Sequence, residues 1–391
     1  MIRFRKDDDT AYPDLEKASL KDISFYVTKT KLGPKKSFIS TENMKKECAG
    51  VIFDIDDGNP VKGIGYEPND ILVSNIRPYL KKTWKADRTG ICSTDVLCIR
   101  GRDFVNSNFL YAILSSDKFF DYDMQGAKGT KMPRGDKKHI MNMPVFLPCL
   151  EEQQKIADFL SSVDEVIFES EKELANLEIQ KKGAMQKIFS QEVRFNADNG
   201  SDYPDWEEKH LGEITELYTG KSFSKQLSED GQFIVMDMGT VTSDGLRIEK
   251  KHTDVDRDVL LANDLVMPKD DIGGGLIICK TVHIPMDNKY VLGDHVYRLR
   301  FLTQNGLFMH YLINCEDVHT AFMKKVTGSA QKGIKASDVS NQAVRLPCLE
   351  EQQKIADFLS DFDTAIEEAK KEIECWKQIK KGLLQQIFDN H

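Results

Sequence analysis

The densest positive charge in the sequence lies in a glycine-containing segment, residues 128–138. Its two glycines and one proline predict a loop. Basic loops can neutralise nucleic-acid phosphates, glycine permits close backbone approach, and an arginine matches the edge of guanine. The alternative is an ordinary solvated surface loop. The basic residues of this first loop are Lys128, Lys131, Arg134, Lys137 and Lys138.

A second loop of this kind lies 199 residues further along the chain, at residues 327–335. Gln331 offers the donor and acceptor pair that suits an adenine edge, in contrast to Arg134 in the first loop. Equivalent loops with different side chains predict two surfaces that recognise different bases. The candidate residues here are Lys324, Lys325, Ser329, Gln331, Lys332 and Lys335.

Polar residues also follow an expected strand at residues 71–75. The basic residues among them supply charge, and a tyrosine supplies an aromatic face. The counterpart at residues 269–275 is acidic and rich in glycine, so only Lys269 is kept as a candidate there. Its aspartates could accept from a cytosine amino group, but acidic turn residues are the favoured interpretation. The candidates in the first half are Asn75, Arg77, Tyr79, Lys81 and Lys82.

A third group of candidates lies near the start of each half of the chain. The second half matches the first only loosely in this region. The group contains Lys29, Lys31, Lys35 and Lys36 in the first half, and Lys221, Ser224 and Lys225 in the second.

The catalytic motifs of DNA methyltransferases and P-loop ATPases are absent from the sequence. It contains no Pro-Pro pair, as a DNA methyltransferase motif would need, and no GxxxxGK[ST] phosphate loop. The glycines at 273–275 have the wrong spacing for a dinucleotide fingerprint. The Pro-Asp at residues 13–14 could suggest a nuclease. It recurs at 204–205, however, which favours a structural role at the start of each domain. We therefore expect a protein that is not an enzyme and holds no metal or cofactor of its own.

The chain contains a long internal repeat. Residues 147–161 recur without change as residues 346–360, and the similarity continues to residues 188–189 and 387–388 at the same offset of 199. The starts of the two halves match at an offset of 191, at residues 12–16 and 203–207. Shared ends and divergent middles predict one scaffold that presents two different surfaces.

Each repeat contains an apolar stripe with the three- and four-residue spacing of a coiled coil. Ser170, Lys181 and Lys380 interrupt it. A helix with one stripe cannot bury it alone, so we expect the two helices to pair, with the antiparallel arrangement favoured. They could be simple tethers or could also dock a partner. The stripe residues are Ile156, Leu160, Val163, Ile167, Leu174, Leu177 and Ile188, then Ile355, Leu359, Phe362, Ile366, Ile373, Trp376, Leu383 and Ile387.

Short strand-like runs and late helical stretches predict an α+β fold in each globular segment. The runs lie at 49–55, 71–75 and 95–99 in the first segment, and at 233–236, 264–267, 276–278 and 296–301 in the second. Helices are expected at 107–114 and 307–313. The expected architecture is therefore two mixed α/β domains joined by two long antiparallel coiled-coil helices with approximate twofold symmetry. The boundaries are 1–146 and 193–345 for the domains, and 147–192 and 346–391 for the helices.

The net charge of −9 argues mildly against a nucleic-acid partner, so its distribution matters. Residues 1–146 carry +5, residues 193–345 carry −5, and the two helical segments carry −5 and −4. The second domain must therefore bind through a local patch. No apolar run is long enough for a membrane span, and the eight cysteines include no CxxC pair, so a cytoplasmic protein with reduced thiols is expected.

The alternation of two variable domains with two near-identical helices resembles the specificity (S) subunit of type I restriction-modification systems. Residues 69–78 ("NDILVSNIRP") and the helix opening "LPCLEEQQKIADFLS" carry this resemblance, which covers essentially the whole chain. It implies two target recognition domains that each read one half of a bipartite double-stranded DNA target. It also implies helices that set the spacing and dock two methyltransferase (M) subunits, and restriction/translocase (R) subunits that join them.

In that family the chemistry belongs to the partners. The resemblance implies adenine-N6 methylation with the base flipped into the partner's pocket, or restriction, with S-adenosylmethionine, ATP and Mg²⁺ held by partner subunits. The alternative is a helical scaffold or interaction protein in which DNA binding is vestigial.

Overall fold

The protein is represented by a computed structural model that describes residues 3–55, 57–243, 245–271, 275–328 and 331–388. The chain divides into two compact units. Unit 1 comprises residues 1–172 and 369–391, and unit 2 comprises residues 173–368. Each unit therefore contains one β-rich domain and segments of both long helices.

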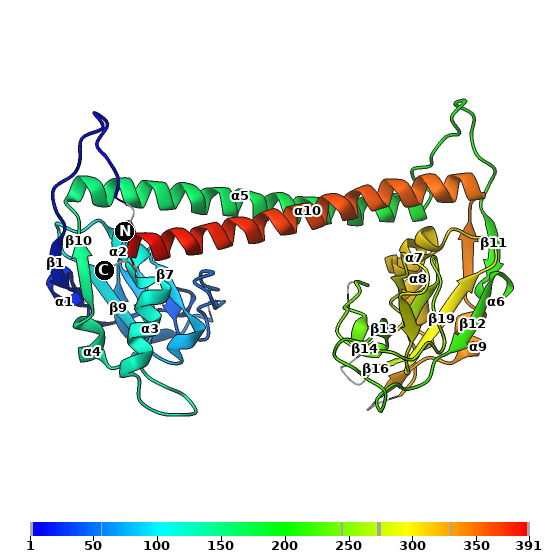
Figure 1. The fold of residues 1–391 in the computed structure, drawn as a ribbon, viewed down its shortest axis with the longest axis horizontal. Coiled ribbons are helices and arrows are strands. Elements are labelled where there is room, and N and C mark those ends of the chain that lie inside the picture. Colours follow the sequence, from blue (N-terminus) through cyan, green and yellow to red (C-terminus); the bar gives the residue numbers. More distant parts are fainter. Residues whose placement is uncertain (1–2, 56, 244, 272–274, 329–330, 389–391) are drawn as a thin grey trace. The chain divides into compact units, whose positions relative to one another are not determined.

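The domain of unit 1 precedes the first long helix in the chain (Figure 1). Its elements are β1 (Glu16–Ser19), α1 (Leu20–Ile23), β2 (Ser24–Tyr26), β3 (Thr30–Pro34), η1 (Lys35–Ser37), β4 (Phe38–Ile39), β5 (Pro60–Tyr66), β6 (Ile71–Ser74), η2 (Pro78–Leu80), β7 (Thr83–Lys85), β8 (Gly90–Cys92), β9 (Val96–Gly101), α2 (Ser107–Leu114), α3 (Asp117–Gly126), α4 (Lys137–Met141) and β10 (Pro144–Leu147).

The centre of unit 1 is an antiparallel sheet in the order β2-β9-β6-β7. Successive side chains of a strand point to opposite faces, and β6 is buried on both. Ile71 and Val73 pack in the same core as the residues of α2 and α3, whereas Leu72 packs with the second sheet, in the order β3-β5-β8-β4. The long loop between α3 and α4 lies at the end of the domain opposite the long helices (Figure 1).

Unit 2 contains an equivalent domain. Its elements are β11 (Glu207–His210), α6 (Leu211–Ile214), β12 (Thr215–Thr219), β13 (Phe233–Met236), η3 (Met238–Thr240), β14 (His252–Thr253), β15 (Leu265–Pro268), β16 (Asp270–Asp271), β17 (Val282–His283), β18 (Tyr290–Leu292), β19 (Val296–Phe301), α7 (Gly306–Asn314), α8 (Glu316–Met323), β20 (Lys332–Gly333), α9 (Ala336–Ser340) and β21 (Ala343–Leu346).

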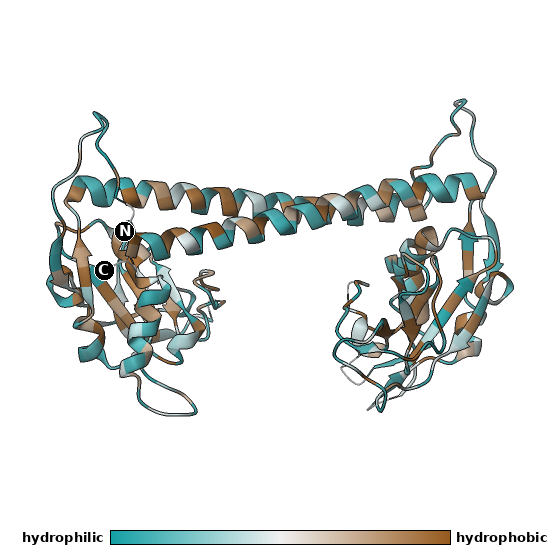
Figure 2. Ribbon diagram, in the orientation of Figure 1, coloured by the Kyte–Doolittle hydropathy of each residue, from teal (hydrophilic) through white to brown (hydrophobic). Residues whose placement is uncertain are grey.

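The central sheet of unit 2 has the order β12-β19-β15-β17 and the same two-sided burial. Leu265 and Met267 face the core that contains α7 and α8, and Val266 faces the second sheet. That second sheet has the order β14-β13-β18, which differs from the four-stranded sheet of unit 1. Apolar residues gather on the central strands of each domain (Figure 2). The shared frame and the different second sheets confirm a common scaffold with divergent middles.

Two of the expected strands are wrong. Residues 49–55 form no regular strand and are paired only through a single bridge from Val51 to Met44. Glu47, Cys48 and Gly50 have positive φ, a conformation that regular strands do not adopt. Residues 276–278 lie in a turn, which Cys279 ends with a φ of 61°. Apolar composition alone suggested strands in both places.

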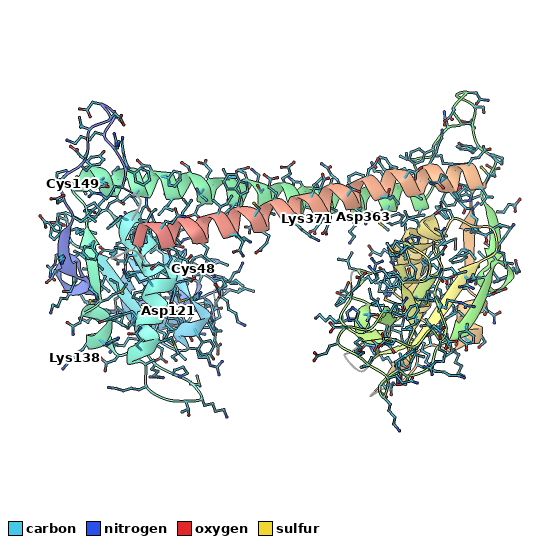
Figure 3. All side chains as sticks on the ribbon, viewed as in Figure 1. Cys48, Asp121, Lys138, Cys149, Asp363 and Lys371 are labelled. Carbon is cyan, nitrogen blue, oxygen red and sulfur yellow. The ribbon has the colours of Figure 1, made fainter. Side chains whose placement is uncertain are left out.

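The long helices are α5 (Leu150–Phe189) and α10 (Leu349–Phe388). Within unit 1, Asp164 and Glu171 of α5 pair with Lys380 and Lys377 of α10 respectively. The partners advance along α5 while they retreat along α10, so the segments are antiparallel. Unit 2 repeats the arrangement with Lys181 and Asp363, the residue labelled on α10 in Figure 3. Two α+β domains with packed antiparallel long helices confirm the expected fold class.

The apolar stripes of α5 and α10 contact the domains as well as each other. Ile156, Leu160, Leu383 and Ile387 pack in the core of unit 1, and Ile188, Ile355 and Leu359 pack in that of unit 2. Val163, Ile167, Ile366 and Ile373 are buried, whereas Leu174, Leu177, Phe362 and Trp376 are half-buried. The helices are thus part of each domain's core rather than simple tethers.

An ion pair with a buried carboxylate and a partly exposed guanidinium ties the start of each long helix to the start of its half of the chain. Arg3 donates to both carboxylate oxygens of Glu152, at 2.8 and 2.9 Å, and Arg194 does the same to Glu351, at 3.2 and 2.7 Å. Both glutamates are completely buried. The sequence carries a signal for this contact, since Arg3 and Arg194 are separated by the offset of 191.

No helix among the described residues is long and apolar enough to cross a membrane. All eight cysteines are free thiols.

Candidate nucleic-acid interface

In unit 1, the residues after β6 and the first basic loop form one surface, although some 50 residues separate them in the chain. The backbone N–H of Arg77 donates to the carbonyl of Pro133 at 2.8 Å, and that of Gly135 donates to the carbonyl of Asn75 at 3.2 Å. Lys128 and Arg134 close the loop through two mutual backbone hydrogen bonds of 2.9 Å. Two candidate groups are thereby brought together.

Acidic neighbours orient the charged side chains of the loop. Arg134 pairs with Asp95 at 3.1 Å, and Lys128 pairs with Asp136 at 2.9 Å. The hydrogen bond from Lys128 and backbone donors lower the pKa of Asp136 to about 2. Lys131, Lys137 and Lys138 are exposed, and Figure 3 shows Lys138 at the edge of the domain. The loop is shorter than the expected residues 128–138, because Lys137 and Lys138 form the first turn of α4. The loop and this helix start together present cations to solvent, as phosphate contacts require.

The backbone of Arg77 lies in the left-handed region, with a φ of 52°. This conformation is uncommon for a residue with a side chain, and such strain gathers at functional positions. Tyr79 is exposed. Lys81 and Lys82 are placed differently from the loop: Lys81 pairs with Asp117 at 2.5 Å, and Lys82 donates to the carbonyl of Thr41 at 2.7 Å. The structure thus joins Asn75 and Arg77 to the loop and commits these two lysines to internal contacts.

Unit 2 has the same junction between strand end and loop. Ile334 donates its N–H to the carbonyl of Lys269, and β16 pairs with β20. Thr327 and Gly333 close the loop as Lys128 and Arg134 do. An open cleft of about 620 Å³ lies there, lined in part by Lys269, Gln331, Lys332 and Lys335.

Two other residues of this loop region lie away from the cleft lining. Lys324 is exposed, and Lys325 donates to the carbonyl of Asp338 at 3.3 Å. Ser329 lies outside the described residues. The cleft in unit 2 therefore gathers four of the seven candidates from the strand end and the loop.

The third candidate group lies beside the second sheet in each unit. In unit 1, a groove of about 570 Å³ is lined by Lys31, Lys36 and Arg88, among others. Lys29 is exposed, and Lys35 pairs with Asp57 at 2.8 Å. Arg88, which our sequence analysis missed, lies over the ring of Phe53 at 4.4 Å. A single arginine between an aspartate and a threonine gives no sequence signal of this stacking.

The corresponding candidates in unit 2, Lys221, Ser224 and Lys225, are exposed. Arg257 supports them: it donates to the carbonyls of Lys221 and Ser222 and lies 4.2 Å from the ring centroid of Phe223. Arg257 is a second residue that sequence reasoning missed, because its 35-residue separation hides the contact.

Within the described ranges, no three His, Cys, Asp or Glu side chains are grouped so as to hold a metal ion. The surface residues described above suit contacts with phosphates and bases, which need cations, amides and exposed backbone.

Comparison with known proteins identifies the family. The family described as "Type I restriction modification DNA specificity domain" matches residues 17–180 and 203–374. The type I restriction enzyme MjaVIII specificity subunit of Methanocaldococcus jannaschii is 28% identical over 367 residues, which cover 89% of this chain and 84% of that protein.

Solved structures share the fold. A chain from a structure described as "Structural basis underlying complex assembly and conformational transition of the type I R-M system" has a TM-score of 0.61 at 17% identity, over 96% of this chain and 97% of its own. The S subunit from M. genitalium has a TM-score of 0.57 at 16% identity, over 96% of both chains. The chain belongs to the type I restriction-modification specificity family and is the system's non-catalytic DNA specificity subunit.

Proposed function

We propose that the two domains of this specificity subunit each read one half of a bipartite double-stranded DNA target. One observation carries the proposal: the same junction of strand end and loop occurs in both units with different side chains. Arg134 in unit 1 and Gly333 in unit 2 occupy the same place in the closing pair. Recognition of two different DNA sequences requires different hydrogen-bonding side chains, and here they are carried by the same backbone arrangement.

The long helices would set the spacing between the half-sites and dock two methyltransferase subunits. Their equal length of 40 residues supports this role. Their acidic character also suits a spacer that does not grip DNA. The partners would supply adenine-N6 methylation, with S-adenosylmethionine as their cofactor, and restriction subunits would supply ATP- and Mg²⁺-dependent cleavage. The segment boundaries 1–146, 147–192, 193–345 and 346–391 are part of this proposal.

The test is to replace residues 1–146 with the corresponding domain of another specificity subunit. We expect methylome sequencing of cells that carry the hybrid and its methyltransferase partner to show a change in one half of the methylated motif only. The unaltered chain is the matched control. A change in both halves would refute modular reading.

A salt titration distinguishes DNA recognition from a scaffold role. Phosphate contacts predict that affinity for random duplexes falls steeply as salt rises. Failure to bind DNA, with or without the methyltransferase, would favour a scaffold with vestigial DNA binding.

A further inference from the structure

Acceptor oxygens without donors lie on two side chains that border Gly135 in the basic loop of unit 1. Asp123 on α3 is fully buried, and neither of its carboxylate oxygens has a hydrogen-bond partner. Oδ1 of Asn75, a residue that is 7% exposed, also lacks one. Both side chains border Gly135, where a Cβ would lie 2.3 Å from Asp123 Oδ1 and 2.9 Å from Asn75 Oδ1. Buried acceptors in this arrangement call for a proton between them.

Unit 2 shows that the scaffold does not need a carboxyl group at this place. At the offset of 199, Phe322 replaces Asp123 and Ile334 replaces Gly135. Both are buried in the core of unit 2. Its loop is nevertheless closed by the same pair of backbone hydrogen bonds. An apolar pair therefore suffices for the fold, and the polar group in unit 1 must serve another purpose.

The surroundings of Asp123 are uncharged except on one side. Burial raises the pKa of Asp123 to about 6, and the charge of His139 on α4 offsets this only partly. Tyr26 on β2 faces it and donates to the carbonyl of Lys137 at 3.1 Å. Asp136, which faces Tyr26, is paired with Lys128.

The other charged groups on the elements packed against α3, including Arg77 at the start of η2, do not shift the pKa of Asp123. Helix α2 contains no charged residue, and Tyr79 of η2 is exposed. Lys81, after η2, pairs with Asp117 at the far end of α3. The carboxyl group therefore changes its charge near neutral pH, and the charge of His139 offsets the cost of ionisation only partly.

We propose that Asp123 is a positioning residue. Its neutral carboxyl group donates a hydrogen bond to Oδ1 of Asn75 and so connects the end of β6 to α3 beneath the loop. Ionisation removes this donor and leaves oxygens facing each other across Gly135, so the strand end and the loop separate more readily. The link to recognition rests on the proposed function: a DNA phosphate beside the loop disfavours a second negative charge. DNA binding by unit 1 therefore takes up a proton at Asp123.

The first test needs no DNA and uses the full chain. Amide hydrogen exchange of Lys128 and Arg134 is followed from pH 5 to pH 8, with the equivalent amides of Thr327 and Gly333 in unit 2 as the internal control for intrinsic exchange. We expect the protection of the unit 1 pair, relative to the unit 2 pair, to fall by about tenfold between pH 5 and pH 7 and to level off above the pKa of Asp123, where the closed loop is itself ionised. Asp123→Asn should remove this difference, because an amide donates at every pH.

A second variant guards against a folding defect in Asp123→Asn. The double variant Asp123→Phe/Gly135→Ile installs the apolar pair that unit 2 already uses, and it too should show no differential pH response. The proposal is overturned if amide protection has the same pH dependence in the wild type and in either folded variant. It is also overturned if the loops of units 1 and 2 respond alike to pH.

The second test measures binding of the complex with its methyltransferase to duplexes in which only one half-site is intact. Affinity for the unit 1 half-site should fall about tenfold between pH 6 and pH 8 in wild type and stay level in Asp123→Asn. The unit 2 half-site should not respond to the variant. If wild type shows no sequence preference at any pH, the proposed function fails; if it shows preference with equal profiles in both proteins, only the role of Asp123 fails.

Discussion

Asp164 on α5 and Lys380 on α10 form an ion pair that unit 2 repeats with Asp363 and Lys181, each residue at an offset of 199 from its equivalent. In unit 2 the hydroxyl of Tyr311 also donates to Asp363, at 2.5 Å, whereas Ala112 stands at that position in unit 1. Two of the three interruptions of the apolar stripe, Lys181 and Lys380, therefore make specific contacts between the helices.

Charge reversal tests this pairing. Lys380→Glu should destabilise unit 1, and the double variant Asp164→Lys/Lys380→Glu should recover about 0.5–1 kcal/mol, since the pair is partly exposed. Asp363→Ala should cost more than Asp164→Ala, because it also leaves the Tyr311 hydroxyl without its acceptor. Hydrogen exchange of each unit measures both effects. Equal losses in the two units would contradict the role of Tyr311.

The pairs Arg3–Glu152 and Arg194–Glu351 should each stabilise their own unit. Arg3→Ala leaves a buried carboxylate without its cation, so we expect a loss of about 3 kcal/mol in unit 1, and Arg194→Ala should do the same in unit 2. Urea unfolding with a probe in each unit measures the loss. Arg5→Ala is the matched control, because its pair with Asp9 is exposed and should contribute less than about 1 kcal/mol.

The two units should respond to acid in opposite directions. Burial lowers the pKa of His283 to about 4 and of His310 to about 3 in unit 2. A folded pKa below the ordinary value of 6.5 means stability that is present above pH 6.5 and is lost as pH falls toward 4. In unit 1 the raised pKa of Asp123 has the reverse effect, since its neutral form fits the fold.

Hydrogen exchange at pH 7 and pH 5 checks this, with rates corrected for intrinsic exchange. Protection should fall in unit 2 and hold or rise in unit 1. His283→Gln should reduce the acid sensitivity of unit 2, because a neutral amide can still contact Oδ1 of Asn263, which lies 3.2 Å from the imidazole. A parallel loss of protection in both units would rule out this explanation.

Arg134 and Lys131 should differ in what they contribute to DNA recognition. Arg134→Ala should relax discrimination in the unit 1 half-site at a cost of about 1–3 kcal/mol, because a guanidinium can pair with a base edge. Lys131→Ala should weaken binding to all sequences alike and reduce the salt slope by about 1. Competition binding with half-site variants measures both. The unit 2 half-site is the control, and an effect of Arg134→Ala there would argue against its place in unit 1.

The long helices could be predicted from the sequence because their signal is local and doubled. The identical stretches 147–161 and 346–360 and the apolar spacing locate helices whose pairing direction the structure confirms. The ion pairs of Lys181 and Lys380 could not be predicted, since each lysine has its acidic partner on the other helix. The sequence of one helix shows only that a lysine interrupts the apolar stripe, whereas the packed helices show the aspartate that pairs with it.

The candidate site was predicted in its parts and not in its assembly. Glycine and charge identified the two loops, but the contact of Arg77 with Pro133 joins segments that no local pattern connects. The internal pairing of Lys81 with Asp117 was invisible for the same reason. Composition identifies where cations lie, whereas tertiary structure decides which of them remain available to a ligand.

The last segment of the sequence, residues 369–391, belongs to unit 1, where Leu383, Leu384, Ile387 and Phe388 complete a core otherwise built from the first half. During synthesis on the ribosome, the domain of unit 1 therefore emerges before that of unit 2 but is completed after it. Until unit 2 has been synthesised, the apolar face that α10 covers in unit 1 remains exposed. A premature stop near the end of the gene would damage the domain encoded at its beginning.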